Sequence, residues 1–352
     1  MYNVSFALTS EDNLPQAILN EISEYDIYAF YLGHAFEVGR LFSSPFRRDL
    51  RPSFGIYQDK NSGKLLYNDF GNVYWKGDCF RFVEQLFSLT YKKALYKVYI
   101  DIVINNKRGR QTIVPYSDHT KLNKLIQYIP KEKLSHVDKR YWKEIGIAEW
   151  ELPFFKIYAA KSLFIDSKEV WSHDETNPIF IYKVFDKIKA YRPLEKDKKY
   201  KWFSNCTRFD IQGWEQLDKD TGEDTLVITK SKKDVAVLRK LGYLAIAPSS
   251  ESTMIPSNAM RILKEEYGFK KFIVLYDRDD GGMKGARKMF TQYRGMYNIT
   301  FKFIPKGYPK DVSEVRRKLG KESTITFLTK ILGYEPNEKL AILPTYGART
   351  AA

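Results

Sequence analysis

The hydrophobic and polar positions of this chain change their period several times along its length. Apolar side chains recur at helical spacing in residues 14–33, LPQAILNEISEYDIYAFYLG, which predicts a helix there. Residues 53–70 alternate instead, and turn at KNSGK, which predicts two strands. The segment GDCFRFVEQLF predicts a helix, and polar and basic residues at 104–118 then interrupt the pattern. We therefore expect the first domain boundary in that interruption.

A different pattern fills the rest of the chain. Three apolar segments, FFKIYAA, IFIYKVF and KIKAYRPL, predict short strands of a small mixed domain. From Thr225 onward strand and helix alternate, with strands expected at TLVIT, YLAIA, FIVLY and ITFKFIP. This alternation predicts a mostly parallel sheet covered by helices on both faces. The expected domains are residues 1–110, 111–220 and 221–335, followed by a tail at 336–352.

The composition is that of a folded protein with two or three domains. The chain has 352 residues, of which 43% are hydrophobic and 29% charged. It shows no apolar run long enough to span a membrane and no secretory signal pattern in its first residues, so we expect a cytoplasmic protein without a membrane partner. The two cysteines, Cys79 and Cys206, are too few for a disulfide framework or a cysteine-rich zinc site, and we expect buried thiols.

The net charge and the aromatic content indicate a binding partner. The formal net charge is +15, and 15% of the residues are aromatic, with 25 tyrosines among them. Positive charge attracts phosphates and aromatic rings stack on unpaired bases, so the combination favours binding of single-stranded nucleic acid. The alternative is that the aromatic residues fill cores and the lysines only keep the protein soluble.

Two aspartates at the end of a predicted strand are the clearest chemical signal. In FIVLYDRDDGG, Asp277 and Asp279 are two residues apart, so in an extended segment both carboxylates point to the same side, beyond the carboxyl end of a buried strand. Asp311 and Glu314 follow the next strand in PKDVSE. Carboxylates in such a place favour a Mg²⁺ or Mn²⁺ site for phosphoryl transfer. The alternative is a solvated turn or a helix cap.

The region around these aspartates resembles a known family. The segments TLVITKSKKDVAVLRKLGY, FIVLYDRDDGGMKGARK and PKDVSE are similar to the Toprim domain that DnaG-type primases and topoisomerases share. The resemblance implies metal binding by Asp277, Asp279 and Asp311, and catalytic roles for Asp277 and Asp279.

One position departs from the family pattern. Lys230 stands where the family has Glu, and Ser231 stands where it has Gly, whereas Asp234 matches the family's later acidic residue of the catalytic set. A charged lysine neither binds a metal ion nor accepts a proton, so at this catalytic position we expect it to place a cation near a phosphate. Glu251, after the second strand, is a candidate compensating metal ligand. Lys232 and Lys233, at the start of a helix, are expected to bind phosphate.

The N-terminal region shows a second resemblance. SPFRRDLRPSFGIY followed by LLYNDFGNVYWKGDCFRFVEQL is similar to the zinc-binding domain of DnaG-type primases with each zinc ligand replaced. Ser44, Arg47, Asp69 and Asn72 stand at the ligand positions, and they cannot replace thiolates on tetrahedral zinc, so we expect no zinc. Arg47 and Asp69 should instead form an ion pair. Arg47 and Arg48 are also candidate DNA contacts. The alternative is that the resemblance to the zinc-binding domain is a chance match.

The middle region shows a third resemblance, and it lies between the other two as in the primase family. IFIYKVFDKIKAYRPLEKDKKYKWFSN resembles the part of the primase core that precedes Toprim. The resemblance places Arg192, Lys201 and Asn205 at positions that hold nucleotide or template. The alternative is a solvated basic loop.

Together the resemblances imply a bacteriophage-like DNA primase, active in the host cytoplasm, that copies single-stranded DNA into short RNA primers from ribonucleoside triphosphates. The implied fold is an α+β, zinc-ribbon-like N-terminal domain without zinc, followed by a mixed α/β primase core with a Rossmann-like Toprim domain. No phosphate-binding loop of the helicase type occurs, so a separate replicative helicase is implied. The alternatives are a catalytically altered protein that binds single strands or loads a helicase, and a Toprim nuclease.

Overall fold

A computed structural model describes residues 13–47, 49, 51–72, 74–105, 125–250 and 253–343. The chain divides into two compact units, Met1–Asn123 and Lys124–Ala352. The boundary expected after residue 110 lies outside the described residues, as does most of the tail expected from residue 336. Among the described residues, no helix is both long and apolar enough to cross a membrane.

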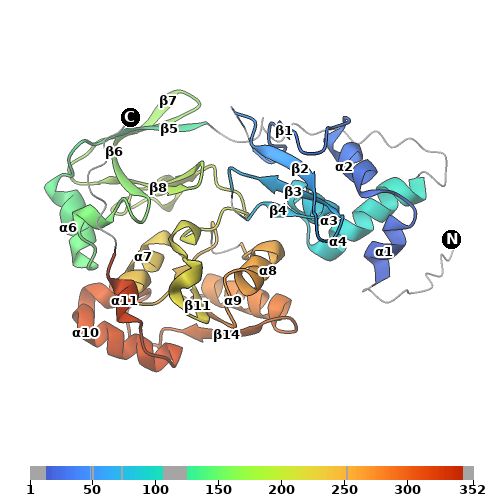
Figure 1. The fold of residues 1–352 in the computed structure, drawn as a ribbon. Coiled ribbons are helices and arrows are strands. Elements are labelled where there is room, and N and C mark those ends of the chain that lie inside the picture. Colours follow the sequence, from blue (N-terminus) through green and yellow to red (C-terminus); the bar gives the residue numbers. More distant parts are fainter. Residues whose placement is uncertain are drawn as a thin grey trace. The chain divides into compact units, whose positions relative to one another are not determined.

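The N-terminal unit combines helices with one small antiparallel sheet (Figure 1). Its strands follow the order β1-β2-β3-β4, and the predicted hairpin at 53–70 is confirmed as β2 and β3. The elements are α1 (Leu14–Leu19), α2 (Glu24–Leu32), β1 (Leu41–Phe42), β2 (Phe54–Gln58), β3 (Leu65–Asp69), β4 (Lys76–Gly77), α3 (Cys79–Leu86), α4 (Tyr91–Val98) and the π-helical turn η2 (Tyr99–Ile104).

The single helix expected over residues 14–33 is in fact two helices. Ser23 has an extended backbone, and its hydroxyl accepts a hydrogen bond from the backbone N–H of Asp26 at 3.1 Å, so a new helix begins there. Apolar spacing alone did not reveal this cap, because the hydrophobic period continues across the break.

The second unit begins with a six-stranded antiparallel sheet. The strand order is β10-β9-β8-β6-β5, and β7 pairs with β6. The predicted strands are confirmed in β6, β8 and β9, whereas β5, β7 and β10 were not expected from the pattern. The elements are β5 (Ile126–Pro130), α6 (His136–Glu144), η4 (Glu149–Glu151), β6 (Ile157–Ile165), β7 (Lys168–Ser172), β8 (Ile179–Val184), β9 (Lys187–Tyr191), η5 (Lys198–Tyr200) and β10 (Trp202–Ser204).

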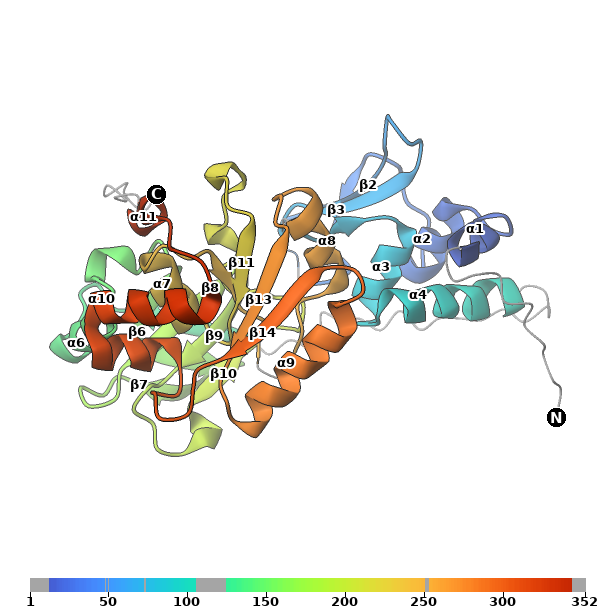
Figure 2. The same ribbon diagram turned by 90° about the horizontal axis from the view of Figure 1, so that it is seen from below.

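A four-stranded parallel sheet follows, as the alternation of elements predicted. Its order is β12-β11-β13-β14, with every pair parallel. Helices α7 and α10 lie on one side of it and α8 and α9 on the other (Figure 2). The elements are η6 (Trp214–Gln216), η7 (Lys219–Thr221), β11 (Thr225–Ile228), α7 (Lys232–Lys240), β12 (Ala245–Ile246), α8 (Ser257–Glu265), β13 (Lys271–Tyr276), α9 (Asp280–Tyr293), β14 (Asn298–Phe303), α10 (Val312–Leu332) and α11 (Glu338–Ala341).

One continuous hydrophobic core joins the two sheets of this unit. Trp142 and Phe180 of the antiparallel part belong to the same buried cluster as Val235 of α7, Leu275 of β13 and Val315 of α10. The expected domains at 111–220 and 221–335 therefore meet in one compact unit. As a result, side chains from both sheets can line one site.

Candidate functional site

The polar cluster of the second unit lies where the parallel strands end. Lys230 follows β11, Asp277 directly follows β13, and Asp311 precedes α10 in the connection after β14. Because these three strands are neighbours and run in the same direction, their carboxyl ends meet at one edge of the sheet. Ligand sites of open α/β sheets lie at this edge.

Asp277 is buried, and two lysines contact it. Lys230 donates a hydrogen bond to Asp277 Oδ2, and Lys310 Nζ lies 3.5 Å from the same oxygen. Burial raises the pKa of Asp277 to about 6, although the Lys230 ammonium acts in the opposite direction. Burial also disfavours a charged Lys230, but the carboxylates of Asp234 and Asp277 raise its pKa overall. Asp277 therefore loses its proton near pH 6, beside a lysine that stays charged.

Asp279 combines a helix cap with an ion pair. Its Oδ1 accepts a hydrogen bond from the backbone N–H of Gly282 at 2.9 Å, and its Oδ2 lies 2.7 Å from Lys310 Nζ. The bond from Lys310, with the one from Gly282, lowers the pKa of Asp279. Gly282 is required for close packing, since a Cβ there would lie 2.2 Å from the carbonyl oxygen of Asp277.

Asp311 also has two functions, as the N-cap of α10 and as a partner of a lysine. It accepts from the backbone N–H of Glu314 at 2.9 Å and from Lys233 Nζ at 3.2 Å, and Lys230 Nζ is 4.0 Å away. Burial alone would raise the pKa of Asp311, but the charge of Lys233 and the bond from Glu314 outweigh it and lower the pKa. Asp311 is thus held as a carboxylate.

Asp234, the fourth aspartate, is fully buried and serves the structure. One oxygen accepts from the Ser231 hydroxyl at 2.6 Å, and the other accepts from the backbone N–H of Ser313 at 3.1 Å and from its hydroxyl at 2.5 Å. These bonds tie the start of α7 to the start of α10. The carboxylate therefore positions the edge of the cluster and does not face a ligand.

A cavity of about 810 Å³ opens beside this cluster, within the second unit. Among the described residues, six cationic side chains and one carboxylate, that of Asp311, line it, together with hydroxyls and aromatic rings. Its aromatic wall contains Tyr191 and Trp202, whose rings stack with centroids 3.9 Å apart. The cationic residues are Lys189, Lys201, Arg208, Lys230, Lys233 and Lys310. Such a lining suits a ligand that carries both phosphates and an aromatic base.

The structure places the predicted basic residues in different environments. Lys201, Lys230 and Lys233 line the cavity. Lys232 does not: it is fully buried, its Nζ lies 3.3 Å from Gln216 Oε1 and 3.8 Å from Glu215 Oε2, and burial lowers its pKa. We correct the expectation for Lys232, because a side chain that faces the protein interior does not reach a bound phosphate.

Two further predicted residues stabilise local structure. Asn205 accepts a hydrogen bond from the backbone N–H of Ile188 at 2.8 Å, which holds the end of β10 to β9. The Arg192 guanidinium lies 3.7 Å from Glu195 and 4.0 Å from Asp174, and neither Arg192 nor Asn205 lines the cavity. The predicted residues Glu251 and Arg48 lie outside the described residues.

The cavity residues that the sequence prediction missed include Lys189, Trp202, Arg208 and Lys310. For Lys310 a signal was present, since it directly precedes Asp311 in the motif that the prediction used. For Lys189 the alternation in KIKAY shows which residues share a face of β9, but not that this face borders a cavity.

The aspartates offer oxygen ligands for a divalent ion, but lysines already contact them. Among the described residues, no group of three or more His, Cys, Asp or Glu side chains is arranged to hold a metal ion. Lys310 is the more easily displaced partner, because 61% of its side chain is exposed, against 11% for Lys230.

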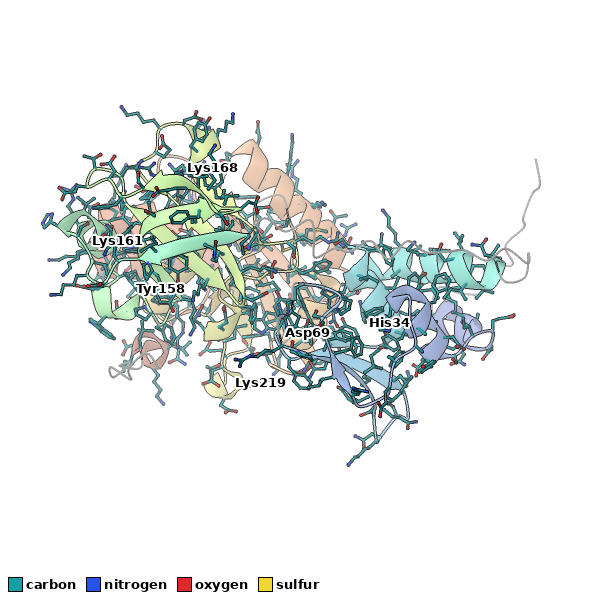
Figure 3. All side chains as sticks on the ribbon, turned by 90° about the horizontal axis from the view of Figure 1, so that it is seen from above. His34, Asp69, Tyr158, Lys161, Lys168 and Lys219 are labelled. Atoms are coloured by element: carbon teal, nitrogen blue, oxygen red, sulfur yellow. The ribbon has the colours of Figure 1, made fainter. Side chains whose placement is uncertain are left out.

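The N-terminal unit contains a separate polar network, in which the ion pair expected between Arg47 and Asp69 is confirmed. Arg47 Nη2 lies 3.0 Å from Asp69 Oδ1, and the Ser44 hydroxyl donates to Asp69 Oδ2 at 2.5 Å. Arg47 also lies 3.3 Å from Asp49 and donates to Ser53. Asp69, labelled in Figure 3, is buried. This network links the segment before β2 to the end of β3.

We predict that the purified protein holds no stoichiometric zinc. The carboxylate of Asp69 is already neutralised by Arg47. Burial raises the pKa of the Cys79 thiol, which disfavours the thiolate form that binds a metal ion. Metal analysis by mass spectrometry after dialysis against a chelator provides the measurement. One zinc per chain that survives this dialysis would contradict the prediction.

Comparisons with known proteins give little guidance. No family model matches the sequence, and no curated protein matches it. Among solved structures, the primase fragment of the bacteriophage T7 primase-helicase protein is 14% identical, with a TM-score of 0.38 over 56% of this chain and 77% of that one. A chain from the bacteriophage T7 lagging-strand DNA polymerase in complex with primase domains, an RNA/DNA hybrid and dTTP is 15% identical, with a TM-score of 0.36 over 60% and 94%. Likenesses at TM-scores below 0.5 do not define a shared fold, and none of the inferences below depends on them.

Proposed function

We propose that this protein is a DnaG-type primase, which makes short RNA primers on single-stranded DNA from ribonucleoside triphosphates. The observation that carries the proposal is the cavity of about 810 Å³, where six cationic side chains and a stacked Tyr191–Trp202 pair adjoin aspartates at the carboxyl edge of a parallel sheet. The motif resemblances to the Toprim domain and to the rest of the primase core support it. The single hydrophobic core that joins the two sheets agrees with these resemblances, because they place both sheets in one primase core.

The residues have distinct roles in this proposal. Lys230, Lys233 and Lys310 bind the triphosphate, because their ammonium groups converge on one side of the cavity. The Tyr191–Trp202 pair forms an aromatic wall beside the nucleotide, and Lys201 and Arg208 contact the template backbone. A Mg²⁺ or Mn²⁺ ion held by Asp277 and Asp279, with Asp311 nearby, would neutralise the triphosphate and activate the attacking 3′ hydroxyl. A separate helicase would deliver the template.

A second candidate function is a primase relative that binds single strands or loads a helicase without catalysis. The contact between Lys230 and Asp277 favours it, because this lysine occupies the place where the family has a carboxylate. In that case the cationic cavity binds nucleic acid, while the aspartates only hold the lysines in place.

One assay distinguishes these functions. The protein is incubated with single-stranded DNA, labelled ribonucleotides and Mg²⁺ or Mn²⁺, and the products are separated on a denaturing gel. Short RNA products are the result we expect. Complexes without products support the binding protein, and cleaved DNA supports a nuclease; either outcome overturns the primase proposal.

We predict that binding to single-stranded DNA weakens steeply with salt. If Lys189, Lys201 and Arg208, the cavity cations outside the triphosphate site, each neutralise one phosphate, affinity should fall by about tenfold or more between roughly 50 and 200 mM salt. Fluorescence anisotropy with a labelled oligonucleotide measures this, and Lys201→Gln should reduce the salt dependence by about one contact. Equal affinities at the two salt concentrations would exclude an electrostatic mode of binding.

A further inference from the structure

The aspartates that a ligand can reach are already matched by lysines. Asp277 accepts a hydrogen bond from Lys230. A carboxylate oxygen of Asp279 lies 2.7 Å from Lys310 Nζ, and one of Asp311 lies 3.2 Å from Lys233 Nζ. Asp234 lies behind these pairs, where the serines at the starts of α7 and α10 donate to its oxygens, and its carboxylate helps to hold Lys230 as a cation. Among the described residues, each of the three aspartates at this edge of the sheet is therefore paired with a lysine.

The lysines of the cluster differ in their freedom to move. The Lys230 side chain is 11% exposed, and it approaches two carboxylates, those of Asp277 and Asp311. The Lys310 side chain is 61% exposed and extends from the loop between β14 and α10. Removing Lys230 would deprive the buried Asp277 of its nearest cation and leave it beside the exposed Lys310, whereas Lys310 can leave Asp279 for a ligand or for water.

This difference determines where a divalent ion can enter. An ion placed between Asp277 and Asp311 would lie next to the fixed ammonium of Lys230, and like charges at such short range repel strongly in a partly buried site. An ion at Asp279 displaces only Lys310, which remains available to bind a phosphate. The geometry thus leaves room for one divalent ion and keeps a protein cation at the second position.

We propose that Lys230 is a resident cation that replaces one divalent ion, so that the cavity binds a triphosphate group without metal and takes up at most one divalent ion, at Asp279. This inference rests on the proposed function only in that a nucleoside triphosphate enters the cavity. Lys230, Lys233 and Lys310 supply the charge that metal ions would otherwise supply to the phosphates.

The first test measures ATP binding to the full chain by calorimetry, with Mg²⁺ and with excess EDTA. We expect the same affinity in both, and weaker binding of adenosine. Lys230→Met should weaken ATP binding in EDTA by at least about tenfold, the scale of one charge-assisted hydrogen bond. Lys168→Met is the matched control, because Lys168 is an exposed residue of β7 outside the cavity (Figure 3). Loss of ATP binding in EDTA, or equal binding of adenosine, would overturn the proposal.

The second test counts Mn²⁺ ions by electron paramagnetic resonance. The parent protein should bind no more than one ion per chain, and Lys230→Glu should add a second ion, since it removes a cation and supplies a carboxylate. Thermal melting verifies that each variant is folded, and if Lys230→Glu is not, Lys230→Met still tests the calorimetric result. Two ions in the parent protein would overturn the proposal.

The outcomes also separate this inference from the proposed function. A parent protein that binds ATP in EDTA but makes no primers would sustain the resident cation and reject the primase. A protein that makes primers while holding two Mn²⁺ ions would reject the resident cation and sustain the primase.

Discussion

Asp279→Asn is expected to reduce primer synthesis by at least about a hundredfold, the scale of losing one electrostatic stabiliser of the transition state. The substitution keeps the volume of the side chain and the oxygen that caps Gly282, but removes the charge that pairs with Lys310. Affinity for single-stranded DNA should stay equal or rise slightly, because a negative charge next to a polyanion is removed. Primer yield and oligonucleotide anisotropy, measured on the same preparation, provide the two values.

Asp280→Asn is the matched control for this variant. It makes the same chemical change at the next residue, which is exposed and does not line the cavity. Asp277→Asn is a less clean test, because it also removes a buried partner of Lys230. If Asp279→Asn makes primers as fast as the parent protein, the metal assignment is wrong and the binding protein becomes the better explanation.

Asp69→Ala is expected to destabilise the sheet of the N-terminal unit by about 3–5 kcal/mol, the cost of breaking a buried ion pair from one side. The carboxylate accepts from Arg47, from the Ser44 hydroxyl and from the backbone N–H of Gly71, and its removal leaves the guanidinium with less compensation in a buried place. Hydrogen exchange followed by mass spectrometry over β2 and β3 measures the local free energy of opening without interference from the second unit.

Two further variants show whether the effect belongs to the buried pair. Glu37→Ala breaks an exposed ion pair with Arg40 in the same unit and should cost less than about 1 kcal/mol. The double variant Arg47→Met with Asp69→Leu removes both charges and should recover much of the stability, since a buried pair often adds little over apolar packing. An Asp69→Ala protein with unchanged exchange over β2 and β3 would show that the pair does not hold this unit together.

Hydrophobic periodicity predicted the order and type of most elements near the site. The alternation from Thr225 to Phe303 predicted a parallel sheet, because buried strands and amphipathic helices have different hydrophobic periods. It also placed Asp277 and Asp279 at the carboxyl edge, since they directly follow a strand. In the N-terminal unit, the resemblance to the primase zinc-binding domain predicted the pair between Arg47 and Asp69, which the structure contains.

Which of these charges meet one another, and which face the cavity, depends on strand order and helix packing. Lys232 and Lys233 are adjacent in sequence, yet one is buried and the other lines the cavity, because successive residues of a helix point in different directions and the packing of α7 fixes its rotation. Lys230 contacts Asp277, 47 positions away, because β11 and β13 are neighbours. Trp202 and Lys189 join the site from the other sheet. Such contacts depend on strand order and packing between sheets, which the local period of a sequence does not encode.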